Sequence, residues 1–128
     1  MNGYISNIEE ETLNNTFFRK VLYTAPHSQL VLMCLKPSED IGLEVHENVD
    51  QFIRIEQGEG KAVLDGEETL VKDGSAIVVP AGARHNVVNT SSTQELKLYT
   101  IYSPAEHKDG TIHKTKEEAM TDEEDHAE

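Results

Sequence analysis

Hydrophobic and polar residues alternate with a period of two over most of the chain between residues 17 and 102. Such alternation places successive side chains on opposite faces of an extended strand. Turn residues, chiefly Gly, Pro and Asn, separate the runs, so the pattern predicts an antiparallel all-β sandwich or barrel. The runs are FFRKVLYT, QLVLMCL, GLEVH, QFIRIE, KAVLDG, EETLVKDG, SAIVVP, HNVVNT and LKLYTIY.

Local signals refine this fold at one turn and at the two ends. The dipeptide Asp65-Gly66 separates two alternating runs, which is typical of a tight β-hairpin. Residues 6–14 begin with the pattern Ser6-x-x-Glu9, which favours a helix with a capping box, and residues 115–120 suffice for one or two helical turns. We therefore expect short helical turns at the ends of a β-domain.

The length and charge of the chain limit its organisation and its partners. A chain of 128 residues suits one domain, which we place at residues 1–114, before an acidic tail at 115–128 that we expect to be flexible. The formal net charge of −13 argues against nucleic acid or an anionic membrane as a partner. No apolar run approaches the roughly 20 residues of a membrane-spanning helix.

The cysteine content and the first residues bear on the compartment. The N-terminal residues MNGYISNIEEE lack the basic start and apolar centre of a signal peptide. The single cysteine, Cys34, lies within an apolar strand and is interpreted as a small core residue. These features predict a cytoplasmic protein.

The segment GLEVH presents two polar side chains on one face of a predicted strand. Glu44 and His46 share that face, and Val45 lies on the other. The spacing alone leaves open whether the pair faces the interior, or faces solvent while Val45 is buried.

The next run, QFIRIE, is less ambiguous. Gln51 shares its face with Ile53 and Ile55, so we expect Gln51 to point into the barrel and Asp50 to point outward. The outward face also carries Phe52, Arg54 and Glu56.

At residues 74–89, GSAIVVPAGARHNVVN, the sequence resembles the cupin family. The family's second motif, G-x5-P-x-G-x2-H-x3-N, is matched throughout by Gly74, Pro80, Gly82, His85 and Asn89. The first motif, G-x5-H-x-H-x3,4-E-x6-G, is matched at His46 and Gly58. Glu44 replaces the first histidine, Gln51 takes the acidic position, and the opening glycine is not kept. The resemblance covers about residues 30–103 and implies a double-stranded β-helix, or jelly-roll, barrel.

The resemblance also implies a ligand set for one metal ion: Glu44, His46, Gln51 and His85. Asp50 is the rival acidic ligand, because the motif allows either spacing. Two imidazoles, one carboxylate and one amide oxygen suit a divalent transition metal such as Mn, Fe, Ni or Zn. Four protein ligands would leave two positions of a six-coordinate ion open for Lewis-acid chemistry.

Three functions are compatible with such a site. The first is a metal-dependent isomerase or tautomerase acting on a small polar carbonyl or hydroxy compound, such as a sugar or sugar acid. The second is a non-haem metal dioxygenase, because Glu44, His46 and His85 make a two-histidine, one-carboxylate set. The third is a non-enzymatic cupin that binds a small ligand.

Other polar residues are weaker candidates. His107 and His113 follow the last strand and are expected to be solvated loop residues, with a second metal site as the alternative; His126 lies in the tail. Tyr99 and Tyr102 lie on opposite faces of their strand, so at most one of them lines the pocket.

We expect the protein to be a homodimer, as cupins often are. An exposed edge strand must be covered, and FFRKVLYT, with Phe17 and Phe18, is the candidate dimer strand. Phe52, on the outward face of its own strand, could join the same interface.

Overall fold

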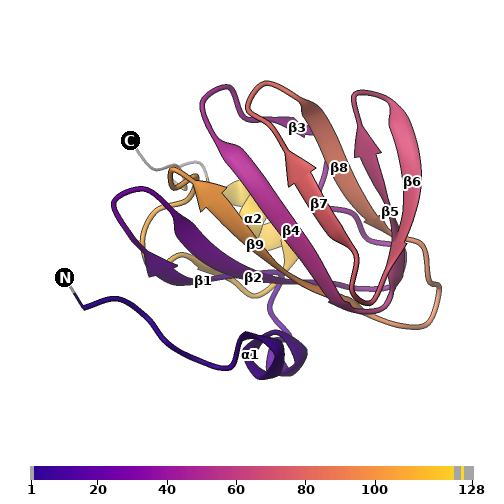
Figure 1. Cartoon of the computed structure of the whole chain (residues 1–128). Coiled ribbons are helices and arrows are strands. Elements are labelled where there is room, and N and C mark those ends of the chain that lie inside the picture. The colour runs from indigo at the N-terminus through magenta and orange to yellow at the C-terminus, as the bar shows by residue number, and fades with distance from the viewer. Residues whose placement is uncertain (1, 123–124, 126–128) are drawn as a thin grey trace.

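The computed structural model describes residues 2–122 and 125, and it consists of two antiparallel β-sheets that face each other, with a short helix near each end (Figure 1). The helices are α1 (Ile8–Asn14) and α2 (Lys116–Thr121). The strands are β1 (Arg19–Thr24), β2 (Gln29–Leu35), β3 (Glu44–Val45), β4 (Asp50–Gln57), β5 (Glu59–Leu64), β6 (Glu67–Lys72), β7 (Ala76–Val79), β8 (Arg84–Asn89), β9 (Leu96–Ser103) and β10 (Ile112–His113).

The strand order confirms the predicted jelly-roll barrel. One sheet has the order β10-β1-β2-β9-β4-β7 and the other has the order β3-β8-β5-β6. Neighbours such as β2 and β9 are distant in sequence, because the chain crosses between the sheets after β2, β3, β4, β6, β7 and β8. The inner faces of both sheets form one core of Val, Ile, Leu, Met, Phe and Tyr side chains.

Strand β2 departs from simple alternation, since side chains on both of its faces are buried. Val31 and Met33 belong to the core, while Leu32 and Cys34, on the other face, are only 1% and 2% exposed. Helix α1 contacts β2, β4 and β9, which explains how the outer face is covered as well. Burial, with a smaller effect from Glu95, raises the pKa of the Cys34 thiol to about 12, consistent with a core residue rather than a nucleophile.

Two turns show how the sequence directs the chain. Leu64 pairs with Glu67 around Asp65 and Gly66, which both have positive φ, so the predicted hairpin is confirmed. Gly58 has φ of +108°, and a Cβ there would lie 2.7 Å from the carbonyl oxygen of Glu95. The closing glycine of the first motif therefore serves the backbone: only glycine fits where β4 passes into β5.

The two helices form where the sequence predicted them, with one change of cap. Helix α1 is capped by Asn7, whose side chain accepts a hydrogen bond from the backbone N–H of Glu10, so the predicted capping box at Ser6 is not the one used. Thr115 caps α2 in the same way through the backbone N–H of Glu118.

The described part of the acidic tail contains a helix and one buried residue, and the flexibility of the tail stays a prediction. Residues Lys116–Thr121 form α2, and Asp125 is only 5% exposed. Residues 123–124 and 126–128, including His126, lie outside the described residues.

Strand β1, the expected dimer strand, does not lie at the edge of its sheet. Strand β1 lies between β10 and β2, and Phe18 is only 3% exposed and belongs to the core. A different apolar feature crosses the outer face of the six-stranded sheet, as a row of cross-strand partners that we call the outer row: Tyr23, Leu30, Ile101, Phe52 and Val78. Neither described helix has the length and hydrophobicity needed to span a membrane.

Candidate metal centre

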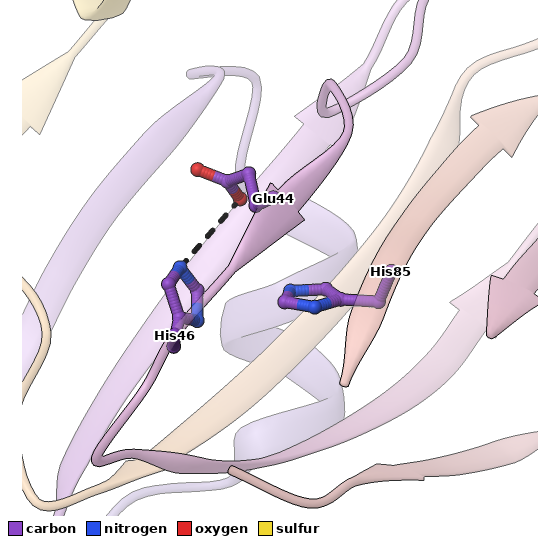
Figure 2. Close-up of side chains that lie close together, drawn as sticks. All are labelled: Glu44, His46 and His85. Atoms are coloured by element: carbon purple, nitrogen blue, oxygen red, sulfur yellow. Dashed lines mark ion pairs between the residues drawn. The ribbon is translucent and has the colours of Figure 1, made fainter. Parts of the chain in front are cut away.

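Three potential metal ligands meet at one end of the barrel. Glu44 lies on β3 and is the cross-strand partner of His85 on β8, while His46 follows directly after β3. Figure 2 shows the carboxylate and the two rings turned toward a common space, and one ligand atom from each lies within 4.8 Å of the others. The sequence left open which face of the strand Glu44 and His46 occupy. Val45 is 38% exposed, so Glu44 and His46 lie on the inner face.

The tautomer of His85 follows from its hydrogen bond. Its Nδ1 lies 3.1 Å from the carbonyl oxygen of Ala83, and since a carbonyl only accepts, Nδ1 carries the hydrogen. The neutral ring in this tautomer has its lone pair on Nε2, and this buried atom has no hydrogen-bond partner in the described part of the chain. This is the form in which an imidazole coordinates a metal, oriented by a hydrogen bond to its other nitrogen.

Gln51, on β4, offers a second buried acceptor atom, the oxygen of its side-chain amide. Its side chain is 3% exposed and its Nε2 donates to Oγ1 of Thr100 over 3.0 Å. The remaining atom, Oε1, is buried and has no hydrogen-bond partner among the described residues. The rival ligand, Asp50, is exposed and accepts a hydrogen bond from the backbone N–H of Ala81 over 2.9 Å, so it stabilises the adjacent turn.

A fifth polar side chain, Glu106, faces the same site and was not predicted from the sequence. Its Oε2 lies 4.0 Å from Nε2 of His46, as close as Oε1 of Glu44 at 3.9 Å. The Glu106 side chain is 17% exposed, against 35% for Glu44. Gln29 fixes the local backbone, because its Oε1 accepts hydrogen bonds from the N–H groups of both Glu106 and His107.

A buried chain of hydrogen bonds extends from the site toward the C-terminal segment. The ring of Tyr102 makes an edge contact with His46, and its hydroxyl lies 3.3 Å from Nε2 of His107. Nδ1 of His107 lies 2.8 Å from Asp125, which also accepts from the hydroxyl of Thr111. Tyr102 therefore adjoins the site, as expected for at most one of the two tyrosines.

Burial and hydrogen bonding set the charge states of this chain. Burial lowers the pKa of His107 despite its bond to Asp125, so this imidazole is neutral near pH 7. Burial opposes ionisation of Asp125, but hydrogen bonds from His107 and Thr111 and the charge of Arg19 lower the pKa of this carboxyl to about 2. Burial raises the pKa of Tyr102, which keeps its hydroxyl protonated.

Both loop histidines are buried, so the expectation that they are solvated was wrong. His107 is 5% exposed and His113 is 3% exposed. His113, Asp122 and Asp125 form a second group with metal-ligand spacing. However, these groups already have partners within the protein. Nε2 of His113 lies 2.9 Å from Asp122, and the guanidinium of Arg19 lies 3.3 Å from Nδ1 of His113 and 3.9 Å from Asp125.

The match to a family model decides the classification. The cupin domain model matches residues 31–102, more than half of the chain. This chain belongs to the cupin family.

Two relatives and one crystal structure are similar to this cupin over most of its length. It is 50% identical to protein L612 of Acanthamoeba polyphaga mimivirus over 85% of this chain and 70% of the relative. It is also 50% identical to YrkC of Bacillus subtilis (strain 168), over 91% of this chain and 66% of the relative, so it spans slightly less than two thirds of that protein. The crystal structure of BH2720 from Bacillus halodurans has a TM-score of 0.90 and 44% identity, covering 93% of this cupin and 94% of that chain.

The remaining motif residues of this cupin stabilise the barrel. The side-chain amide of Asn89, 1% exposed, donates to the carbonyl oxygens of Leu35, Lys36 and Gln94. Gly82 has a positive φ and donates its N–H to the carbonyl oxygen of His46. The second motif therefore positions His46 and His85 through the backbone.

Two cavities of this cupin adjoin the site. The larger, about 440 Å³, includes Glu106 and the residues that follow His46; its lining is Pro26, Glu47, Asn48, Val49, Pro104, Ala105 and Glu106. The smaller, about 160 Å³, lies beside α2 and is lined by Phe18, Arg19, Ile41, Glu44, Lys116, Ala119 and Met120. Cupins often bind metal, and this one presents groups of the kind that bind it.

Proposed function

We propose that this cupin is a metal-dependent enzyme of the isomerase or tautomerase type, acting on a small polar compound with neighbouring carbonyl and hydroxyl groups. The observation that carries the proposal is the pair of buried acceptor atoms, Nε2 of His85 and Oε1 of Gln51, without hydrogen-bond partners in the described chain. Such atoms are rare in folded proteins and costly when left unsatisfied. A divalent cation held by Glu44, His46, Gln51 and His85 would satisfy both.

The residues present fit such an ion. Two imidazoles, one carboxylate and one amide oxygen are the donor types that Mn, Fe, Ni and Zn accept. When bound, the ion would act as a Lewis acid toward a carbonyl group. Glu106 would accept a proton from the hydroxyl-bearing carbon beside that carbonyl and return it to the carbonyl carbon. The hydroxyl proton would move to the carbonyl oxygen, so the compound is isomerised without any net oxidation.

Metal analysis and solvent exchange test this function together. The purified protein should contain a transition metal at one equivalent, measured by plasma mass spectrometry, and lose it in the Glu44→Gln, His85→Gln double variant. In D₂O the metal-loaded protein should introduce deuterium beside the carbonyl of dihydroxyacetone or related neutral sugars, followed by proton NMR. A protein that binds such compounds with neither metal nor exchange would be a non-enzymatic binding cupin.

A non-haem metal dioxygenase is the second candidate, favoured by the composition of the three-residue group. Glu44, His46 and His85 are two histidines and one carboxylate, the set found in non-haem iron oxygenases. Oxygen uptake by the iron-loaded protein with a diketone substrate would support this function. Exchange into hydroxy-carbonyl compounds without oxygen uptake would support the isomerase.

The proposed assembly is a homodimer formed through the outer row. Val78 is 66% exposed, and at the opposite end of the row a groove of about 270 Å³ is lined by Tyr4, Tyr23, Leu30 and Ile101, among others. Ile5, 99% exposed and next to Tyr4, supplies an apolar projection beside this groove. A surface with both a projection and a groove is suited to pairing with a second copy of itself.

Light scattering tests the assembly. The wild-type protein should have the mass of two chains at micromolar concentration, and Phe52→Glu should have the mass of one. Thr69→Glu, which places the same charge on exposed strand β6, is the matched control and should remain dimeric.

A cytoplasmic location is also proposed. The single cysteine, Cys34, is free and buried, which is compatible with a reducing compartment. Fractionation of cells that express the full protein, with detection by antibody, tests the location.

A further inference from the structure

Two carboxylates line the larger cavity beside the site. Glu106 and Glu47 both face this space of about 440 Å³, and the described residues that line it include no lysine or arginine. Glu106 also reaches the site itself, since its Oε2 lies 4.0 Å from Nε2 of His46. A compound in this cavity therefore meets two carboxylates, one of which lies beside Nε2 of His46.

The smaller opening beside α2 does not supply the missing positive charge. Arg19 and Lys116 line it, but both are already paired. Arg19 lies 3.9 Å from Asp125, and Lys116 forms an ion pair with Asp40. This opening is also much the smaller of the two, at about 160 Å³.

The formal charges of the site lead to the same result. A divalent ion together with the carboxylates of Glu44 and Glu106 has no net charge. A neutral ligand preserves that balance, whereas an anionic ligand leaves uncompensated negative charge at side chains that are largely buried. Without Glu106, the loaded site would carry a net positive charge and would attract anions.

We infer that Glu106 is a specificity-determining residue that makes this site select neutral hydroxy-carbonyl compounds and exclude anions such as dicarboxylates, uronates and sugar phosphates. This inference rests on the proposed metal-dependent function and narrows its substrate class. It removes sugar acids from the candidates and retains neutral sugars and related ketones. The residue acts through charge, so its effect should depend on the charge of the ligand and not on its size.

Calorimetry with Mn²⁺ and oxalate tests the inference on the full chain. Wild-type protein is first titrated with Mn²⁺, and the loaded protein is then titrated with oxalate, a small chelating dianion. Glu106→Gln should bind oxalate on the order of tenfold more tightly than wild type, because a like charge a few ångströms away has been removed. Glu106→Asp, which keeps the charge, should stay within about threefold of wild type.

The control and the outcomes separate the two proposals. Glu10→Gln changes the net charge equally but lies exposed on α1, so it should leave oxalate affinity unchanged. Equal oxalate affinity in wild type and Glu106→Gln, with Mn²⁺ binding intact in both, overturns the inference and leaves the proposed function standing. A wild-type protein that takes up no Mn²⁺ at this site overturns the proposed function, and the inference with it.

Discussion

The hydroxyl of Tyr102 donates a hydrogen bond to Nε2 of His107 across 3.3 Å. The direction is set from the far side of the imidazole, where Nδ1 donates to the ionised carboxylate of Asp125. The edge of a candidate metal centre is thereby connected through two buried rings to a residue near the C-terminus.

The stability of the fold should decrease in mild acid because of His107. Its pKa is lowered in the folded protein, so below about pH 6.5 the unfolded chain binds a proton there that the folded chain does not. The free energy of unfolding therefore falls as pH decreases below that value. Urea denaturation at pH 7.5 and 5.5 should show a smaller loss for His107→Gln than for wild type; equal losses would contradict the assignment of a neutral buried ring.

Removal of the Asp125 charge should destabilise the protein by about 3 kcal/mol, because it leaves the buried guanidinium of Arg19 without its carboxylate partner. Denaturant unfolding of Asp125→Asn at pH 7 measures the effect. Asp109→Asn, an exposed substitution in the loop between β9 and β10, should change stability by less than about 0.5 kcal/mol. Similar values for both variants would show that Asp125 is not part of a stabilising network.

Metal affinity should distinguish Gln51 from its neighbour Asp50. Gln51→Leu should weaken Mn²⁺ binding on the order of tenfold, and His85→Gln on the order of 100-fold, because each removes an inward acceptor atom. Asp50→Asn should bind Mn²⁺ within about twofold of wild type, since Asp50 faces outward and bonds to the N–H of Ala81. Isothermal titration measures all three, and a large loss in Asp50→Asn alone would make Asp50 the ligand.

Gly58 should be far less tolerant of a methyl group than Gly110, although both have positive φ. In Gly58→Ala the new Cβ would lie 2.7 Å from a carbonyl oxygen and 3.1 Å from Leu96, so we expect a loss of about 3 kcal/mol or more. In Gly110→Ala nothing lies within 4 Å, which leaves only the backbone strain of about 1 kcal/mol. Thermal and urea unfolding measure the stability of both variants. Equal losses of stability in Gly58→Ala and Gly110→Ala would contradict the steric argument.

The Cys34 thiol should be inert in the native protein. Its pKa is raised to about 12 by burial, so very little thiolate exists near neutral pH. Ellman's reagent should react slowly with the folded protein and rapidly in urea. Rapid native reaction would mean that α1 does not cover this face of β2.

The strands and most of the proposed ligands could be predicted because both depend on local pattern. Alternation identified the extended runs, Asp65-Gly66 identified a hairpin, and motif spacing nominated His85 and Gln51, which do carry unsatisfied inward acceptor atoms. Strand β2 was harder to orient, since α1 buries Leu32 on the face that would otherwise meet solvent.

The roles of Glu106, His107 and Asp125 could not be predicted for a related reason. They lie outside the alternating strands, in segments whose path depends on tertiary contacts such as those of Gln29. By composition, an acidic tail with buried contacts looks the same as one that is fully solvated. Asp125 nevertheless contacts a buried imidazole and a guanidinium. The alternation of a strand predicts which of its side chains face inward. It does not predict which distant loop will cover them.

Strand β3 consists of two residues, and it contacts the rest of its sheet only through β8. Position 44 therefore sits at a margin of the fold where an exchange of side chain disturbs little packing, unlike positions 51 and 85, which are enclosed on all sides. A glutamate can stand there in place of the family's histidine without any rearrangement of the interior. We therefore expect exchange of the side chain at position 44, which is 35% exposed, to cost less packing energy than exchange at positions 51 and 85, which are each 3% exposed.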